Sequence, residues 1–204
     1  MATVREIETL LDWKRRIFAL YADVRAHSDP RAAREVWRAT RDELFRTHPQ
    51  SPIPPEKRPS FAGVPYFDYD PSMRFIVELE QAEPETHDIA SSRDGTFSFT
   101  RFANAPVQIG GREFELEVYW LNAYGGGLFV PFRDATSGKT TYGAGRYLLD
   151  TVKGADLGEI DGKLVLDFNF AYNPSCSYDP RWDCPLAPPP NWLRAPVEAG
   201  ERYP

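Results

Sequence analysis

The chain has 204 residues, 24 Lys and Arg against 30 Asp and Glu, a formal net charge of −6 and 42% hydrophobic residues. This composition excludes a disordered chain and argues against a general nucleic-acid binder, which normally presents a basic face. No apolar run is long enough to span a membrane, and the charged start MATVREIETLLDWKRR lacks the apolar segment of a secretory signal. We therefore expect one cytoplasmic domain over residues 1–204, without nucleic-acid or membrane partners.

Two helices are predicted within residues 1–48. Residues 4–26 place apolar side chains at three- and four-residue steps, the spacing of one helix face. The second helix begins at Asp29-Pro30, where the aspartate can cap free amides and proline suits the first helical position. It ends at His48-Pro49, because proline keeps the preceding residue out of the helical region.

A proline-rich segment, residues 49–72, follows the helices. Its closely spaced aromatic residues, among them Phe61 and Tyr66, are unusual in a flexible linker. We interpret the segment as an extended strap that packs against the β body formed by residues 73–170.

From residue 73 to 170 the apolar period changes to two, which is typical of strands with one buried face. Glycine-rich turns and the pair Asp94-Gly95 separate short strands, and the last strand is predicted over 163–170. The pattern predicts an α+β fold, mainly an antiparallel β meander, either a barrel or a sandwich, with the helices over one end or edge. The proline-rich tail, 171–204, predicts no regular element.

Basic residues and glycines gather in residues 131–147, which include Arg133, Tyr142 and Arg146. Glycines let backbone amides approach a ligand, and the planar forks of arginine suit a carboxylate or a phosphate. The segment therefore predicts a hairpin with Arg133, Tyr142 and Arg146 as ligand-binding residues. A solvated surface hairpin explains the same composition.

A second polar segment begins at Asp167 and Asn169, which we place on one face of the last strand, and continues through Tyr172 and Asn173. Asparagine and tyrosine on a loop stiffened by proline suit the orientation of a small polar ligand, so Asn169 and Asn173 are predicted binding residues. Asp167 and Tyr172 are candidates for an acid or base. A structural network that satisfies backbone groups would need the same residue types.

Cys176 and Cys184 leave three interpretations open: buried structural thiols, redox or disulfide chemistry, and catalysis with Cys176 as the nucleophile. A zinc site would need Asp179 or Asp183 as further ligands. That combination is uncommon, so no metal site is predicted.

Three long segments, DELFRTHPQSPI, LFVPFRDATSGKTTYGAGRYL and LDFNFAYNPSCSYDPRWDCPLAPPPN, carry a family resemblance. They resemble the prokaryotic domain of unknown function family numbered 1684, over essentially the whole chain. The resemblance implies that the two later segments are the family's signature. The family is uncharacterised, so the resemblance implies no catalytic residue and no cofactor.

The favoured hypothesis is a site for a small polar or anionic molecule. The 131–147 hairpin and the 167–184 loop would converge at one end of the body, with Arg133 and Arg146 facing the polar residues of the loop across a cleft. The alternative is a structural or interaction module in which Arg146 pairs with Asp167 and the tail seals that end. A metal- or thiol-dependent enzyme is the third. The sequence leaves the reaction, cofactor and oligomeric state open.

Overall fold

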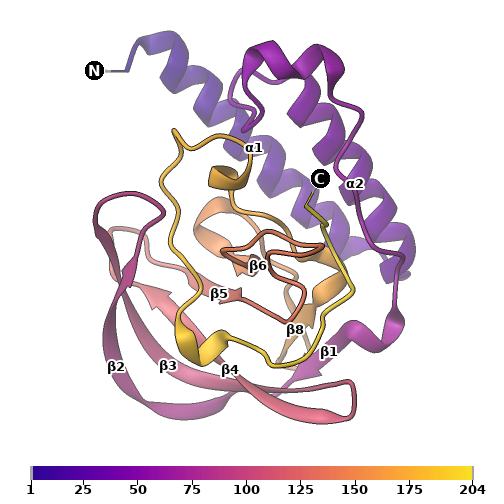
Figure 1. Cartoon of the computed structure of the whole chain (residues 1–204), viewed down its shortest axis with the longest axis vertical. Helices are drawn as coiled ribbons and strands as arrows, with labels where there is room; N and C mark the ends of the chain where they lie inside the picture. The colour runs from indigo at the N-terminus through magenta and orange to yellow at the C-terminus, as the bar shows by residue number, and fades with distance from the viewer. Residues whose placement is uncertain (1, 204) are drawn as a thin grey trace.

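The computed structural model describes residues 2–203 and contains two helices followed by two antiparallel sheets (Figure 1). The helices are α1 (Val4–Ala26) and α2 (Pro30–Thr47). The strands are β1 (Arg74–Val77), β2 (Glu80–Ala90), β3 (Thr96–Ile109), β4 (Arg112–Leu121), β5 (Leu128–Phe132), β6 (Arg146–Asp150), β7 (Glu159–Ile160) and β8 (Lys163–Asp167).

The strands form one five-stranded sheet in the order β2-β3-β4-β5-β6 and one three-stranded sheet in the order β1-β8-β7. All the pairs are antiparallel, which confirms the predicted α+β class. Both sheets have open strand orders, so the two-sheet alternative describes the fold better than a closed barrel. The pairing of β1 with β8 joins the first and last strands, and this pairing builds the cavity described below.

The helix starts agree with the local sequence signals. Thr3 and Glu6 form a reciprocal capping box at α1, and the Asp29 carboxylate accepts from the Arg31 amide at 2.9 Å at α2. The apolar stripe of α1 is buried only in its second half, from Ile17 to Val24, while Leu10 is exposed. The first half projects beyond the body of the protein (Figure 1), so the predicted buried face extends over only part of the helix.

Two strands differ from what the sequence pattern indicates. Residues 80–90 lack the alternation of a half-buried strand, yet β2 lies there as an exposed edge strand. Exposure of both faces removes the alternation that identifies half-buried strands, and glutamates on the edge discourage pairing with other chains. The last strand ends at Asp167, not at residue 170, because Asp167 caps a 3-10 turn over Phe168–Phe170.

The strap and the tail lie against each other. The Phe67 amide donates to the Gly200 carbonyl at 3.0 Å, and the Arg202 amide donates to the Pro65 carbonyl at 2.8 Å. Tyr66 of the strap packs edge-on against Trp37 of α2. The strap is therefore packed and is not a flexible linker, but these neighbours are α2 and the tail, not the predicted β body.

One cluster of buried apolar side chains joins the helices, both sheets and the tail, and it includes Trp37, Val118, Leu166 and Val197. Figure 1 shows the tail, in gold and yellow, running around β5 and β6, with the helices above and with β2, β3 and β4 of the same sheet below. This packing positions the end of α1 and the start of α2 beside β8.

Candidate functional site

Arg146, the central residue of the predicted cleft, is fully buried and points toward the tail. Its terminal nitrogens donate to the carbonyls of Val197 (2.9 Å), Ala199 and Glu201 (3.1 Å), and to the Asp134 carboxylate at 3.3 Å. The predicted pairing of Arg146 with Asp167 is therefore wrong, because Asp134 of the same hairpin takes its place. The tail does close this region, as the structural alternative expected.

The other features of the hairpin also have structural partners. Arg133 lies over the ring of Trp192 at 4.6 Å. Gly145 has a φ of 98°, and an added Cβ would collide with the Phe132 carbonyl oxygen. This glycine therefore allows close packing within the hairpin and does not open the backbone to a ligand.

Asn173 and Tyr172 lie beside a second buried ion pair, between Arg41 and Glu201. The Glu201 carboxylate accepts from the Asn173 amide at 2.6 Å and from the Tyr178 hydroxyl at 3.1 Å, while the Asn173 side chain donates to the Arg202 carbonyl at 2.9 Å. A cavity of about 70 Å³ adjoins this network. Both oxygens of Glu201 and both nitrogens of Asn173 are engaged, which favours a structural role, whereas Oδ1 of Asn173 has no hydrogen-bond partner among residues 2–203.

Among the contacts within residues 2–203, the predicted binding residues of the hairpin meet the candidate residues of the loop at one place only. This contact joins Tyr142 to Cys176. The Tyr142 hydroxyl lies 3.9 Å from the Cys176 sulfur. Both cysteines are free thiols. Among the described residues, no three His, Cys, Asp or Glu side chains come together as a group that could hold a metal ion.

Asp167 presents a different situation, because its buried carboxylate is only half satisfied. Its Oδ1 accepts from the Asn169 amide at 2.9 Å and from the Asn169 side chain at 2.8 Å. Its Oδ2 has no hydrogen-bond partner among residues 2–203, and the side chain is 1% exposed. Burial raises the pKa of Asp167 to about 6, against the opposing effects of the Asn169 hydrogen bonds and of Arg74.

Asn169 holds this carboxylate in place. Its Oδ1 accepts from the Asp70 amide at 2.8 Å, and its Nδ2 donates to the Asp70 carbonyl at 2.7 Å as well as to Asp167. Asn169 therefore connects the strap to the end of β8, and it positions Asp167 as part of a rigid unit.

Arg74 lies opposite Asp167 across the β1–β8 pair, with its Nε 3.6 Å from Oδ2. Its side chain is 22% exposed, and in the part of the chain that the structure describes its guanidinium makes no hydrogen bond. The planar guanidinium of Arg74, with unused donors, therefore lies beside the Asp167 carboxylate, which has one unused oxygen. Sequence reasoning missed Arg74, because no local signal indicates that the first strand pairs with the last.

Both side chains line a cavity of about 130 Å³ at the junction of α1, α2 and the three-stranded sheet. Apolar side chains supply much of its wall, namely Val24, Ala33, Leu157, Ile160, Val165 and Phe170. Arg25 also lines the cavity, but it donates to the Asp156 carbonyl at 2.7 Å. His27 and Glu159 line the cavity as well. The cavity therefore combines an apolar wall with one arginine whose donors are unused, one half-satisfied carboxylate and three further polar side chains, those of Arg25, His27 and Glu159.

By its fold and this cavity, the protein is a two-sheet α+β protein with a small, partly apolar pocket beside the buried carboxylate of Asp167. Residues 59–202 match the family described as "Protein of unknown function (DUF1684)", and the chain belongs to that family. It is similar to the solution NMR structure of an uncharacterized protein of Haloarcula marismortui, with 39% identity and a TM-score of 0.59 over 82% of this chain and 91% of that one. No curated protein matches it.

Proposed function

We propose that the protein binds a small carboxylic acid in the cavity beside Asp167. The observation that carries the proposal is the unpartnered, buried Oδ2 of Asp167, next to the unused donors of Arg74. Buried polar atoms without partners are rare in folded proteins, and a ligand that supplies the missing partner is one explanation.

The dimensions and lining of the cavity indicate the ligand class. A volume of about 130 Å³ is comparable with apolar cavities of roughly 150 Å³ that bind benzene. The apolar wall suits a short hydrocarbon or aromatic body, and the Arg74 guanidinium suits a carboxylate. A monocarboxylate of the size of butyrate or benzoate fits these requirements.

Asp167 gives the binding a dependence on pH. A bound carboxylate beside Oδ2 would repel an ionised Asp167 but accept a hydrogen bond from the protonated form. Because the pKa of Asp167 is raised to about 6, the protonated fraction is large at pH 6 and falls as the pH rises. Binding that requires this proton weakens about tenfold for each pH unit above 6.

The test is a titration of the full chain with butyrate and with benzoate at pH 6 and at pH 8. Backbone amide chemical shifts monitor the binding. We expect saturable shifts around Asp167, Arg74 and Val165, with weaker binding at pH 8. Asp167→Asn should remove the pH dependence, because its amide can donate at both pH values. Shifts that do not saturate, or that lie elsewhere, would overturn the proposal.

Two arginine variants separate the site from general surface charge. Arg74→Gln removes the unused fork and should weaken binding about tenfold or more. Arg25→Gln is the matched control, because Arg25 lines the same cavity but is already engaged by Asp156. Equal affinities of the two variants would contradict the role assigned to Arg74.

We also propose a cytoplasmic location, since both cysteines are free thiols, the state that a reducing compartment maintains. No helix in the described part of the chain is long and apolar enough to cross a membrane.

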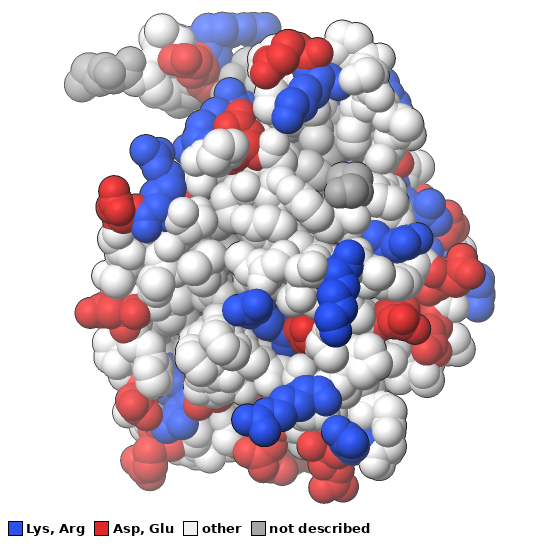
Figure 2. Space-filling view, in the orientation of Figure 1, with Lys and Arg blue, Asp and Glu red and all other residues white. Residues whose placement is uncertain are grey.

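Basic and acidic side chains are interspersed on the face seen in Figure 2, which favours a small-molecule partner over a nucleic acid.

A further inference from the structure

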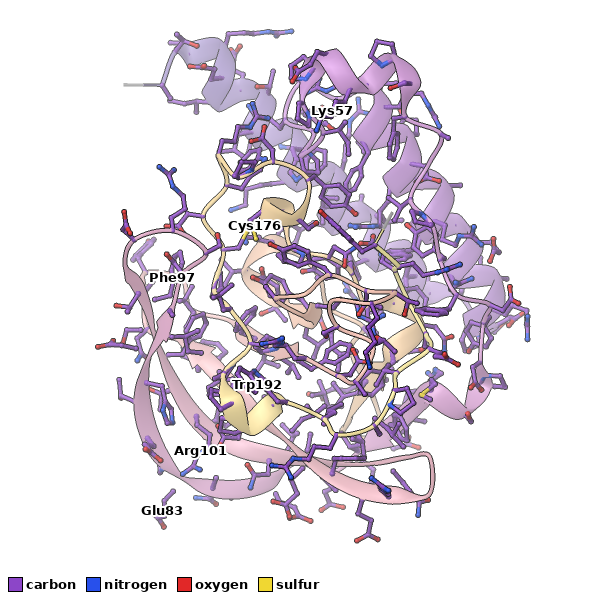
Figure 3. All side chains as sticks on the ribbon, in the orientation of Figure 1. Lys57, Glu83, Phe97, Arg101, Cys176 and Trp192 are labelled. Atoms are coloured by element: carbon purple, nitrogen blue, oxygen red, sulfur yellow. The ribbon has the colours of Figure 1, made fainter. Side chains whose placement is uncertain are left out.

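The first half of α1 carries a line of large apolar side chains that the fold leaves uncovered. These residues, which we call the exposed stripe, are Val4, Ile7, Leu11 and Phe18, and each is between 47% and 75% exposed. Val4, Leu11 and Phe18 follow one another at intervals of seven residues, and Ile7 comes three residues after Val4, which is the a and d spacing of a seam between two helices. Figure 3 shows the first turns of α1 at the upper left, clear of both sheets. Aligned apolar side chains on an exposed helix are typical of an interaction surface.

The exposed stripe is distinct from the face by which α1 packs on the rest of the protein. At 3.6 residues per turn, the stripe lies about 120° around the helix from the buried face of Ile17–Val24. In the first turns, the Gln50 side chain donates to the Thr9 hydroxyl at 2.9 Å, on nearly the opposite side of the helix from the stripe. The inner end of the stripe touches the body, since Phe18 lies against Gly154 in the turn after β6. The outer part of the stripe is therefore available to a partner.

Glu8 and Arg15 flank the exposed stripe on one side, seven residues apart. Both are exposed, and among residues 2–203 neither forms an ion pair or a side-chain hydrogen bond, whereas Asp12 and Arg16 on a neighbouring face pair with each other at 3.0 Å. Residues 4–18 contain four basic and three acidic side chains. A helix that binds an anionic membrane surface is normally rich in Lys and Arg, so this balance favours a partner that itself carries both charges.

We propose that the exposed stripe binds a second copy of this chain, through an antiparallel pair of α1 helices related by a two-fold axis. With Leu11 at the centre of the pair, Glu8 of each copy lies within about one residue, roughly 1.5 Å along the axis, of Arg15 of the other copy. The two-fold axis forms this charge pair twice. In a parallel pair, Glu8 would face Thr3 and Arg15 would face Leu10, so neither charge would meet an opposite charge.

Sedimentation velocity of the full chain over a range of protein concentrations tests the proposal. Lys14 interrupts the stripe at the next d position, so we expect a weak dimer, in reversible equilibrium with the monomer at micromolar concentrations. Leu11→Asp should weaken the association about tenfold or more, and far-UV circular dichroism should show a folded protein because Leu11 is exposed. Val36→Asp, at an exposed position of α2, is the matched control and should leave the association unchanged. A monomer at every concentration, or a dimer that Leu11→Asp leaves intact, would overturn the proposal.

Charge reversal tests the antiparallel register. Glu8→Arg places two arginines together at both charge pairs, and Arg15→Glu places two glutamates there, so each variant alone should weaken the dimer. An equimolar mixture of the two variants should recover the parent association, because each pair then joins an arginine to a glutamate. Asp23→Arg reverses a charge on another face of α1 and should have no effect. A mixture that associates no better than the separate variants would overturn the antiparallel pair.

Vesicles that contain phosphatidylserine test a membrane as the other occupant of the stripe. A parent protein that cosediments with these vesicles and stays monomeric without them would assign the stripe to a membrane surface and overturn the proposal. The exposed stripe shares no residue with the Asp167 cavity, so the carboxylate titration succeeds or fails independently of these measurements.

Discussion

Two arginines at the first positions of strands, Arg146 of β6 and Arg74 of β1, show two opposite uses of the same side chain. Arg146 is fully buried and satisfies four acceptors from the hairpin and the tail. Arg74 is partly exposed and has one ionic neighbour at 3.6 Å. The first arginine completes the fold, and the second retains donors that a ligand can use.

The two carboxylates beside these arginines differ in the same way. Asp134 accepts from Arg146, from the Thr136 amide at 3.0 Å and from the Val197 amide at 2.8 Å, so both of its oxygens are engaged. Asp167 has one engaged oxygen and one orphan. The unpartnered carboxylate oxygen therefore distinguishes the candidate binding site from the structural ion pair, in which both carboxylate oxygens are engaged and, within residues 2–203, only the Arg146 Nε lacks a partner.

The largest effect is expected for Arg146→Leu. This change removes the positive charge that balances the buried Asp134 carboxylate and the donor to three tail carbonyls, and it should lower the free energy of unfolding by about 3–5 kcal/mol. Urea denaturation at pH 7 measures the loss. Arg133→Leu is the control, because Arg133 only lies over Trp192, and it should cost less than about 1 kcal/mol. A stable Arg146→Leu protein would show that the tail does not depend on this residue.

Glu201→Gln should have the second largest effect, because it removes the charge that balances the buried guanidinium of Arg41. The new amide would also face the Asn173 amide and the Tyr178 hydroxyl, which now donate to the carboxylate. We expect a loss of about 2–4 kcal/mol in the free energy of unfolding. Glu198→Gln, at an exposed position of the same tail, should lie close to the parent protein, and equal losses would contradict this account.

The helices and the buried network of Arg146 show how much of the fold could be predicted from the sequence. The starts of both helices were predictable, because Asp29-Pro30 and its capping contact are local. The β5–β6 hairpin was also predictable, since its two strands are joined by one turn-rich segment. The partner of Arg146 could not be predicted. The sequence around Asp134 indicates a turn, and it does not show that the same carboxylate also accepts from a buried arginine.

The candidate site was predictable only in part. Asp167 and Asn169 were singled out, and they do share hydrogen bonds, but by a capped turn and not by a common strand face. Arg74 and the α1–α2 junction were absent from the prediction, because they meet Asp167 only through the β1–β8 register. Register between distant strands depends on the whole core, and no short window of sequence contains it.

Asp167→Asn should change stability in a way that depends on pH. An aspartate in an unfolded chain has a pKa of about 3.9. Burial raises the pKa of Asp167 to about 6, so the folded state holds its proton more tightly than the unfolded state. The stabilising contribution of that proton is complete below pH 4 and is lost as the pH rises through 6. Relative to the parent protein, the variant should therefore gain about 1–3 kcal/mol between pH 4 and pH 8.

Thermal or urea unfolding at several pH values measures this gain. Asp161→Asn, in the exposed β7–β8 turn, is the matched control and should follow the parent protein at every pH. A constant difference between Asp167→Asn and the parent protein across this range would mean that the carboxylate is ionised in the folded state at all of these pH values. The proposed proton at Oδ2 would then be excluded.

Arg74→Gln should have the smallest effect on stability and thereby sharpens the comparison with Arg146. Its partly exposed guanidinium makes no hydrogen bond within residues 2–203, so its loss should change the free energy of unfolding by less than about 1 kcal/mol. Removal of the nearby positive charge should also move the pKa of Asp167 further upward, since Arg74 is one of the groups that lower it. Carbon-detected titration of the Asp167 carboxyl measures that shift. A large loss of stability without such a shift would place Arg74 with Arg146 among the structural arginines, and the cavity would then lack an unused anion-binding group.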